Sequence, residues 1–78
     1  MTYKDYARIL RKEVVSKFSI FLKADEALTE HDGFMDIALV GKMNKAYMEW
    51  QHAQMRWSGF IAFVQNSGSN WDTEINTN

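Results

Sequence analysis

The sequence predicts an all-α protein, a two-helix antiparallel hairpin, and three observations lead there. The 78 residues contain no proline and only four glycines, so little interrupts a long helix. Two segments repeat apolar residues at helical spacing. A short acidic stretch separates them, and a polar stretch rich in Ser, Asn and Thr follows them. We therefore expect a hairpin domain over residues 1–66, with or without a short extra helical turn in its connection, and a flexible polar tail over residues 67–78.

The first predicted helix begins near Thr2 and continues to about residue 28. Thr2 and Asp5 have the spacing of a capping box, with Asp in the place of the usual Glu. At about 100° of rotation per residue, the apolar side chains fall on one stripe. The stripe comprises Tyr3, Ala7, Leu10, Val14, Phe18, Phe21 and Leu28, with Leu22 at its edge. Residues 16–22 also have strand-forming composition, so the sequence leaves open whether residues 16–31 form one helix or two.

The predicted connection is acidic, because residues 24–36 contain five Asp and Glu side chains and no Lys or Arg. Gly33 is placed to end the first helix in a left-handed conformation, and Asp32 to cap the second. His31 stands among the acidic residues, but the spacing of a calcium-binding loop is missing. A solvated loop therefore explains this segment better than a metal site.

The second predicted helix covers residues 34–65 and has the clearest pattern. Met43, Trp50, Trp57 and Val64 recur every seven residues. Seven further apolar residues flank them, namely Val40, Tyr47, Ile61, Leu39, Ala46, Ala53 and Phe60. This broad stripe predicts a packed helix face, so we expect the two tryptophans to lie in the core rather than to stack on nucleic-acid bases.

A hairpin of this size buries a thin core, so we expect a homodimer that forms a four-helix bundle. A second apolar strip lies outside the main stripes and supports this expectation. It comprises Ile9, Ile20, Ile37, Met48, Met55 and Ala62. The same strip, and the adaptable Met48 and Met55 in particular, would also suit a different protein partner.

Charge is distributed unevenly although the net charge is only −1. Residues 1–23 hold six basic and two acidic side chains. Four of the basic residues, which we call the basic patch, share one side of the first helix: Lys4, Arg8, Arg11 and Lys12. The basic patch is a candidate contact for an acidic protein surface or for phosphates, although an ordinary solvated helix face has the same appearance.

No catalytic residue, cofactor or metal site is predicted. The chain has no cysteine, no Gly-x-Ser-x-Gly turn and no glycine-rich phosphate loop. Glu49 and His52 have the Glu-x-x-His spacing of di-iron helical bundles, and Glu13 would be the additional carboxylate. Lys45 and Arg56 share their flank and would repel a cation, so the sequence argues against that site.

The sequence favours a small non-enzymatic protein-binding module that acts stoichiometrically as an inhibitor or adaptor. Short independent chains of this kind are typical of phages and mobile elements. The candidate contacts are the basic patch, Met48 and Met55, and Trp71, which would either fold back on the hairpin or bind a partner. Two alternatives remain: a nucleic-acid-binding hairpin dimer that uses the basic patch, and a structural assembly subunit.

The expected location is the cytoplasm, without insertion into a membrane. The N-terminus lacks the apolar stretch of a signal peptide. The longest unbroken apolar run, residues 60–64, is far shorter than the roughly 20 residues that cross a bilayer.

Overall fold

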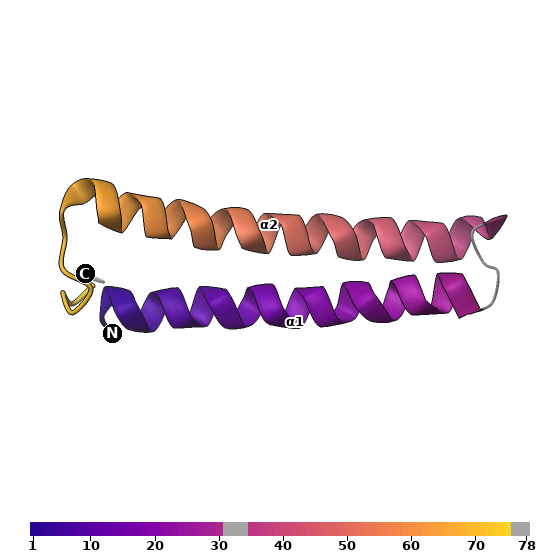
Figure 1. The fold of residues 1–78 in the computed structure, drawn as a ribbon, viewed down its shortest axis with the longest axis horizontal. Coiled ribbons are helices and arrows are strands. Elements are labelled where there is room, and N and C mark those ends of the chain that lie inside the picture. Colours follow the sequence, from indigo (N-terminus) through magenta and orange to yellow (C-terminus); the bar gives the residue numbers. More distant parts are fainter. Residues whose placement is uncertain (31–34, 76–78) are drawn as a thin grey trace.

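Two long antiparallel helices form the molecule. The computed structural model describes residues 1–30 and 35–75. Helix α1 (Tyr3–Glu30) and helix α2 (Ile37–Ser67) lie side by side along a rod of 49 × 20 × 18 Å (Figure 1). Within the described ranges the one pairing of extended backbone is an isolated antiparallel bridge between Thr2 and Glu74. The predicted all-α hairpin is therefore confirmed, while the predicted dimer stays a prediction.

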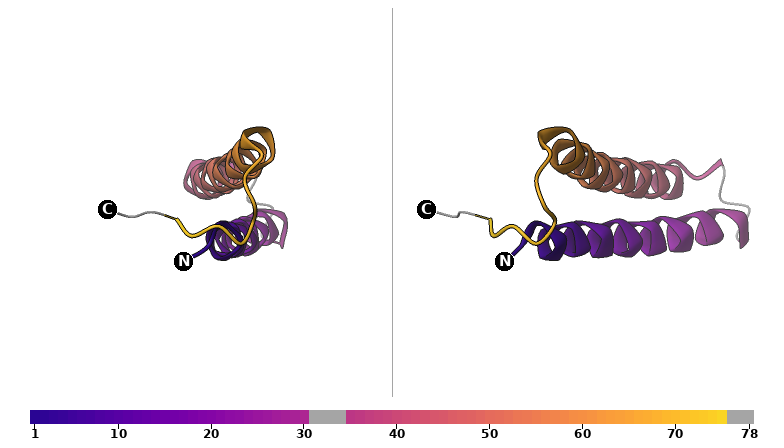
Figure 2. Two further views of the ribbon diagram at one scale, coloured as in Figure 1. Left: turned by 90° about the vertical axis from the view of Figure 1, so that its left-hand side faces the viewer. Right: turned by 60° about the vertical axis from the view of Figure 1, so that its left-hand side comes forward.

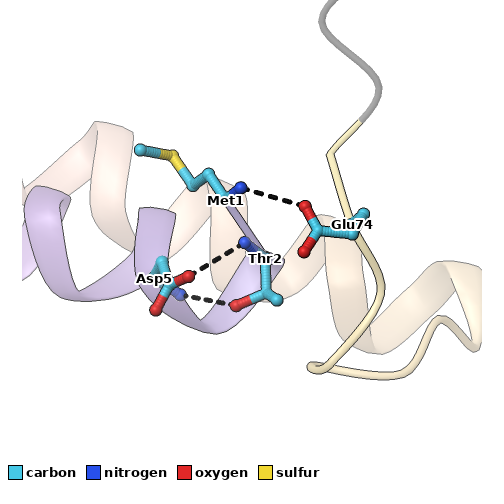
Figure 3. A network of polar contacts seen from close by, with 4 residues as sticks. All are labelled: Met1, Thr2, Asp5 and Glu74. Carbon is cyan, nitrogen blue, oxygen red and sulfur yellow. Dashed lines mark hydrogen bonds and ion pairs between the residues drawn. The ribbon is translucent and has the colours of Figure 1, made fainter.

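Helix α1 begins as the capping box predicts. The backbone N–H of Thr2 donates to the Asp5 carboxylate over 3.0 Å, and the backbone N–H of Asp5 donates to the Thr2 hydroxyl over 3.1 Å (Figure 3). The helix then continues without a break to Glu30, two residues past the predicted end. Residues 16–30 are thus one helix. The expectations for His31, Asp32 and Gly33 lie outside the described residues.

Helix α2 begins at Ile37 and not at Phe34, so the predicted start was wrong by one turn. Asp36 caps the helix with extended backbone angles, φ −87° and ψ 109°. Its carboxylate accepts from the backbone N–H groups of Ala38 at 2.9 Å and Leu39 at 3.3 Å. These bonds satisfy amides that have no partner inside the helix. The prediction placed this cap at Asp32, four residues earlier, which explains the early predicted start.

The end of α2 also lies two residues beyond the prediction, at Ser67 rather than Gln65. Gly68 follows in the left-handed region, with φ 69°, and its backbone N–H donates to the carbonyl of Gln65 over 3.4 Å. A side chain would be strained at this positive φ, so glycine suits the turn that redirects the chain.

The core of the hairpin is narrow. Its buried side chains, at most 6% exposed, are aliphatic and come from both helices: Leu10, Val14, Ala46, Ala53 and Val64. Ala46 and Ala53 let the two helix backbones approach, and aromatic rings fill the space beside them. Phe21 stacks on Trp50 with ring centroids 5.6 Å apart. The predicted stripes thus form the interface, although Phe18 lies at its margin with 38% of its surface exposed.

Residues 68–75, which we call the strap, cross from the end of α2 to the start of α1 (Figure 2). The backbone N–H groups of Tyr3 and Lys4 donate to the carbonyls of Thr73 and Trp71 over 3.0 and 2.9 Å. The strap thereby supplies acceptors for the first amides of α1, which have none within the helix. Trp71 folds back on the hairpin, which was one of the two possibilities that the sequence left open for it. The flexibility of the tail stays a prediction.

Candidate interaction surfaces

Two ion pairs join the helices along one broad side of the hairpin, which we call the ion-pair face. Arg56 pairs with Glu13, and the Lys17 ammonium lies 3.7 Å from the Glu49 carboxylate. Lys42 and Lys45 line a hollow on the same side, next to Ile20. Each carboxylate here has a basic partner on the neighbouring helix, so this face is compensated within one chain.

The residues of the considered di-iron site do meet on the ion-pair face. Glu13, Glu49 and His52 line one hollow of about 230 Å³ together with Lys17 and Arg56. Both carboxylates are engaged by basic side chains, and a metal ion would have to displace them. In residues 1–30 and 35–75, no three His, Asp or Glu side chains gather closely enough to hold a metal ion.

The opposite broad side, which we call the groove face, is built differently. Its central hollow has a volume of about 230 Å³ and is lined by Arg11, Val14, Val15, Phe18, Trp50 and Gln54. The Arg11 guanidinium carbon lies 4.8 Å from the centroid of the Trp57 ring, and the rings of Phe18 and Trp50 lie 4.9 Å apart. Val15 keeps 56% of its surface exposed and Leu22 keeps 42%. The middle of this face is therefore apolar and open to solvent.

The edge of α2 that is turned away from α1 forms a third surface, the outer ridge: Gly41, Met48, Met55 and Ala62, spaced by seven residues. Met48 and Met55 are 57% and 68% exposed. Among residues 1–30 and 35–75, a Cβ atom placed on Gly41 would meet no atom within 4 Å. All four charged side chains of α2 fall within about 60° of one another on the ion-pair side, so the outer ridge carries no charge.

The candidate contact residues lie on separate surfaces. Lys4, Arg8, Arg11 and Lys12 are all exposed on the first half of α1, as the basic patch requires. Met48 and Met55 lie on the outer ridge, across the hairpin. Trp71 lies at the end where the strap crosses, with its ring 6.4 Å from that of Phe60. The predicted second apolar strip is also divided, because Ile20 belongs to the ion-pair face.

An aromatic cluster at the strap end of the hairpin was not predicted as a unit. Its members are Tyr3, Tyr6, Phe60, Phe63 and Trp71. Tyr6 meets Phe60 edge-on at 4.8 Å, a favourable aromatic geometry. Tyr6 and Phe63 lie outside the apolar stripes. Tyr6 follows Tyr3 by three residues and Phe63 follows Phe60 by three, so the two rings of each pair lie on the same side of their helix. This spacing of three residues between aromatic side chains is the sequence signal for the cluster.

Two exposed charged groups at this end have shifted pKa values. The Met1 ammonium group donates to the Glu74 carboxylate over 2.9 Å, and this hydrogen bond raises the pKa of the amino group (Figure 3). The hydrogen bond from the Thr2 backbone N–H lowers the pKa of Asp5. Both groups are therefore held in their charged forms, which favours the docked strap and the capped helix.

Neither helix, over the part of the chain that the structure describes, is long and apolar enough to cross a membrane. No protein-family model matches this chain, and no significant match was found among curated proteins or solved structures.

Proposed function

We propose that this chain is a non-enzymatic protein-binding module that acts by stoichiometric occupation of a partner, as an inhibitor or adaptor. The outer ridge is the contact surface, and its occupant is an apolar helix of a different protein. The observation that carries this proposal is the exposure of Met48 and Met55 on a charge-free helix side.

A helix side that only meets water normally carries charged residues. On α2 the charge-free side extends for about 45 Å, given the rise of about 1.5 Å per residue. Exposed apolar side chains that cluster on a protein surface mark interaction sites, and Met48 and Met55 form such a pair here. Methionine side chains adapt to different shapes, and the glycine and alanine at the ends of the ridge let a second helix approach closely.

The basic patch supports a second candidate, a hairpin that binds nucleic acid. Its four side chains are exposed on one helix, which is the arrangement that phosphate contacts need. The strap, however, brings Asp72 and Glu74 to the same end of the molecule, and its carbonyl groups accept from the first amides of α1. Those acidic groups weaken the local positive potential, so protein binding remains the first candidate.

Photo-crosslinking tests the protein-binding proposal. A photoreactive amino acid replaces Met55 in one version of the chain and Ser16, an exposed residue of α1, in a control version. Both are produced in the cells from which the chain derives, and the crosslinked proteins are identified. We expect one protein to crosslink through position 55 and not through position 16.

The purified partner then completes the test. We expect a complex of fixed stoichiometry with the full chain, and at least a roughly tenfold loss of affinity for the double variant Met48→Glu and Met55→Glu, since a charge is buried against an apolar surface. The control variant Lys42→Glu and Lys45→Glu changes the ion-pair face instead and should bind as the parent does. Equal losses in both variants would disprove the assignment to the outer ridge. Binding to duplex DNA or RNA that weakens steeply with salt would favour the second candidate.

A further inference from the structure

We propose that a second copy of this chain covers the groove face in an antiparallel arrangement, in which Arg11 of each copy faces Asp25 of the other. The proposal concerns a surface other than the outer ridge and does not depend on the proposed function. It rests on the order of charges along α1 and on the matching residues of α2.

The side chains of α1 on the groove face change character along the helix. Lys4, Arg11, Phe18 and Asp25 recur every seven residues and form one row. Arg8, Val15, Leu22 and Thr29 form the next row. Both rows are therefore basic at the start of the helix and apolar in the middle. The first row then ends in an acidic residue, Asp25.

Read from either end, the charges along α1 match: a basic residue lies on one side of Phe18 and an acidic residue lies at the same distance on the other side. Arg11 and Asp25 each stand seven residues from Phe18, a distance of about 10 Å along the axis. A two-fold axis at the level of Phe18, perpendicular to the helices, places Arg11 of one copy at the level of Asp25 of the other. Neither ion pair of the hairpin uses these two side chains, since those pairs lie on the ion-pair face.

The groove-face residues of α2 are centred at the same level of the rod as Phe18. The contact of Phe18 with Trp50, at 4.9 Å between ring centroids, puts the two residues at one level of the rod. The groove-face row of α2 is Val40, Tyr47, Gln54 and Ile61, and its midpoint falls between residues 50 and 51. One axis thus pairs Val40 with Ile61 and Tyr47 with Gln54 across copies, while it also pairs the charges of α1.

The alternative two-fold axis, parallel to the helices, stacks α1 of one copy on α2 of the other. Arg11 would then face the second half of α2, where the groove-face row holds no acidic residue. The charges therefore select the perpendicular axis. The available area is also adequate, since a stable interface needs about 800 Å² per partner and the rod offers a side 49 Å long and 18–20 Å wide.

Charge reversal with complementation tests the arrangement. The variants Arg11→Glu and Asp25→Lys each place like charges opposite one another at both symmetric contacts. We expect each alone to dimerise at least about tenfold more weakly than the parent. In a mixture of the two, every contact again joins opposite charges, so we expect heterodimers. The double variant should also regain a homodimer. Sedimentation over a concentration series measures all four samples, with Lys45→Glu on the ion-pair face as the control.

If heterodimers form on mixing, the single variants have lost the interface and not the fold, because two unfolded variants would not form this dimer. A parent chain that stays at 9.1 kDa throughout the concentration series would overturn the proposal. So would a dimer that both single reversals leave intact, or a mixture that stays monomeric. Met48→Glu with Met55→Glu should leave the dimer unchanged, which keeps this result separate from the test of the outer ridge.

Discussion

The two broad sides of this hairpin are made by the same two helices, yet they leave different chemistry exposed. On the ion-pair face, Glu13 and Glu49 have basic partners on the opposite helix. On the groove face, Arg11 lies over a tryptophan ring, and Val15, Phe18 and Leu22 remain exposed. Charges can thus be compensated within a two-helix unit. Apolar area cannot be fully covered in the same way, because a thin rod has too little interior to bury it.

The two sides should differ most in how far the truncation of a side chain lowers the free energy of unfolding, and the adjacent residues Glu49 and Trp50 allow that test. Trp50→Ala removes the ring that contacts Phe18, Phe21 and Tyr47 on the groove side. Glu49→Ala removes one exposed ion pair on the other side. We expect the first change to lower the free energy of unfolding by about 3 kcal/mol and the second by less than about 1 kcal/mol. Urea denaturation followed by circular dichroism measures both, and equal effects would contradict the comparison.

Gly59 lies beside the outer ridge, about 40° around α2 from Met55. Among the described residues, a Cβ atom on Gly59 would meet no atom within 4 Å, so helix propensity alone should decide the effect of a substitution there. We expect Gly59→Ala to raise the free energy of unfolding by about 0.8–1 kcal/mol, and the matched change Ala62→Gly to lower it by a similar amount. Thermal denaturation at a concentration that keeps the chain monomeric measures both. A destabilising Gly59→Ala would show that this position is crowded in solution.

Arg56 on the ion-pair face and Arg11 on the groove face should respond differently to salt. Arg56 pairs with Glu13, while Arg11 lies 4.8 Å from the Trp57 ring centroid and covers it. We expect either alanine substitution to lower the free energy of unfolding by about 0.5 kcal/mol at low ionic strength. High salt should abolish the effect at Arg56, since exposed ion pairs are screened, and preserve most of the effect at Arg11, which also packs. Urea denaturation in low and high salt, at a concentration that keeps the chain monomeric, measures both. The same salt dependence at both positions would argue against the distinction.

The smallest expected effect concerns the ion pair that holds the strap, outside both faces. The Glu74 carboxylate raises the pKa of the Met1 amino group above 8.0. The contribution to stability is therefore present below pH 8 and is lost as the pH rises through the raised value. We expect the indole N–H signal of Trp71 in nuclear magnetic resonance spectra to shift above pH 8, and Glu74→Gln to remove this response. An unchanged response in that variant would assign the titration to another group.

Much of this architecture follows from periodicity and capping. The seven-residue repeat around Trp50 predicts the packed side of α2, and the Thr2 and Asp5 spacing predicts the first turn of α1. The prediction fails at the start of α2, where Asp36 caps the helix and Asp32 was the expected cap. It also fails for the strap, because backbone hydrogen bonds to Tyr3 and Lys4 leave no trace in side-chain spacing.

The surfaces were predicted less completely than the helices. The basic patch follows from helical rotation alone, and its four residues are exposed as expected. Which flank of α1 faces which flank of α2 depends on how the hairpin closes, and the sequence of one helix does not contain that information. Ile20 and Met48 could therefore be read as parts of one apolar strip, although they lie on different sides of the hairpin.

The strap brings the backbone N–H of Ile75 to within 2.8 Å of the carbonyl oxygen of Met1, so the chain returns to its starting point. This closeness limits how two copies can be fused into one polypeptide. In the proposed antiparallel arrangement, the start of the second copy would lie at the far tip of the rod, 49 Å away. A linker shorter than about 14 residues cannot span that length even when fully extended. Tandem fusions with short linkers should therefore join into open chains of hairpins, and fusions with long linkers should close on themselves.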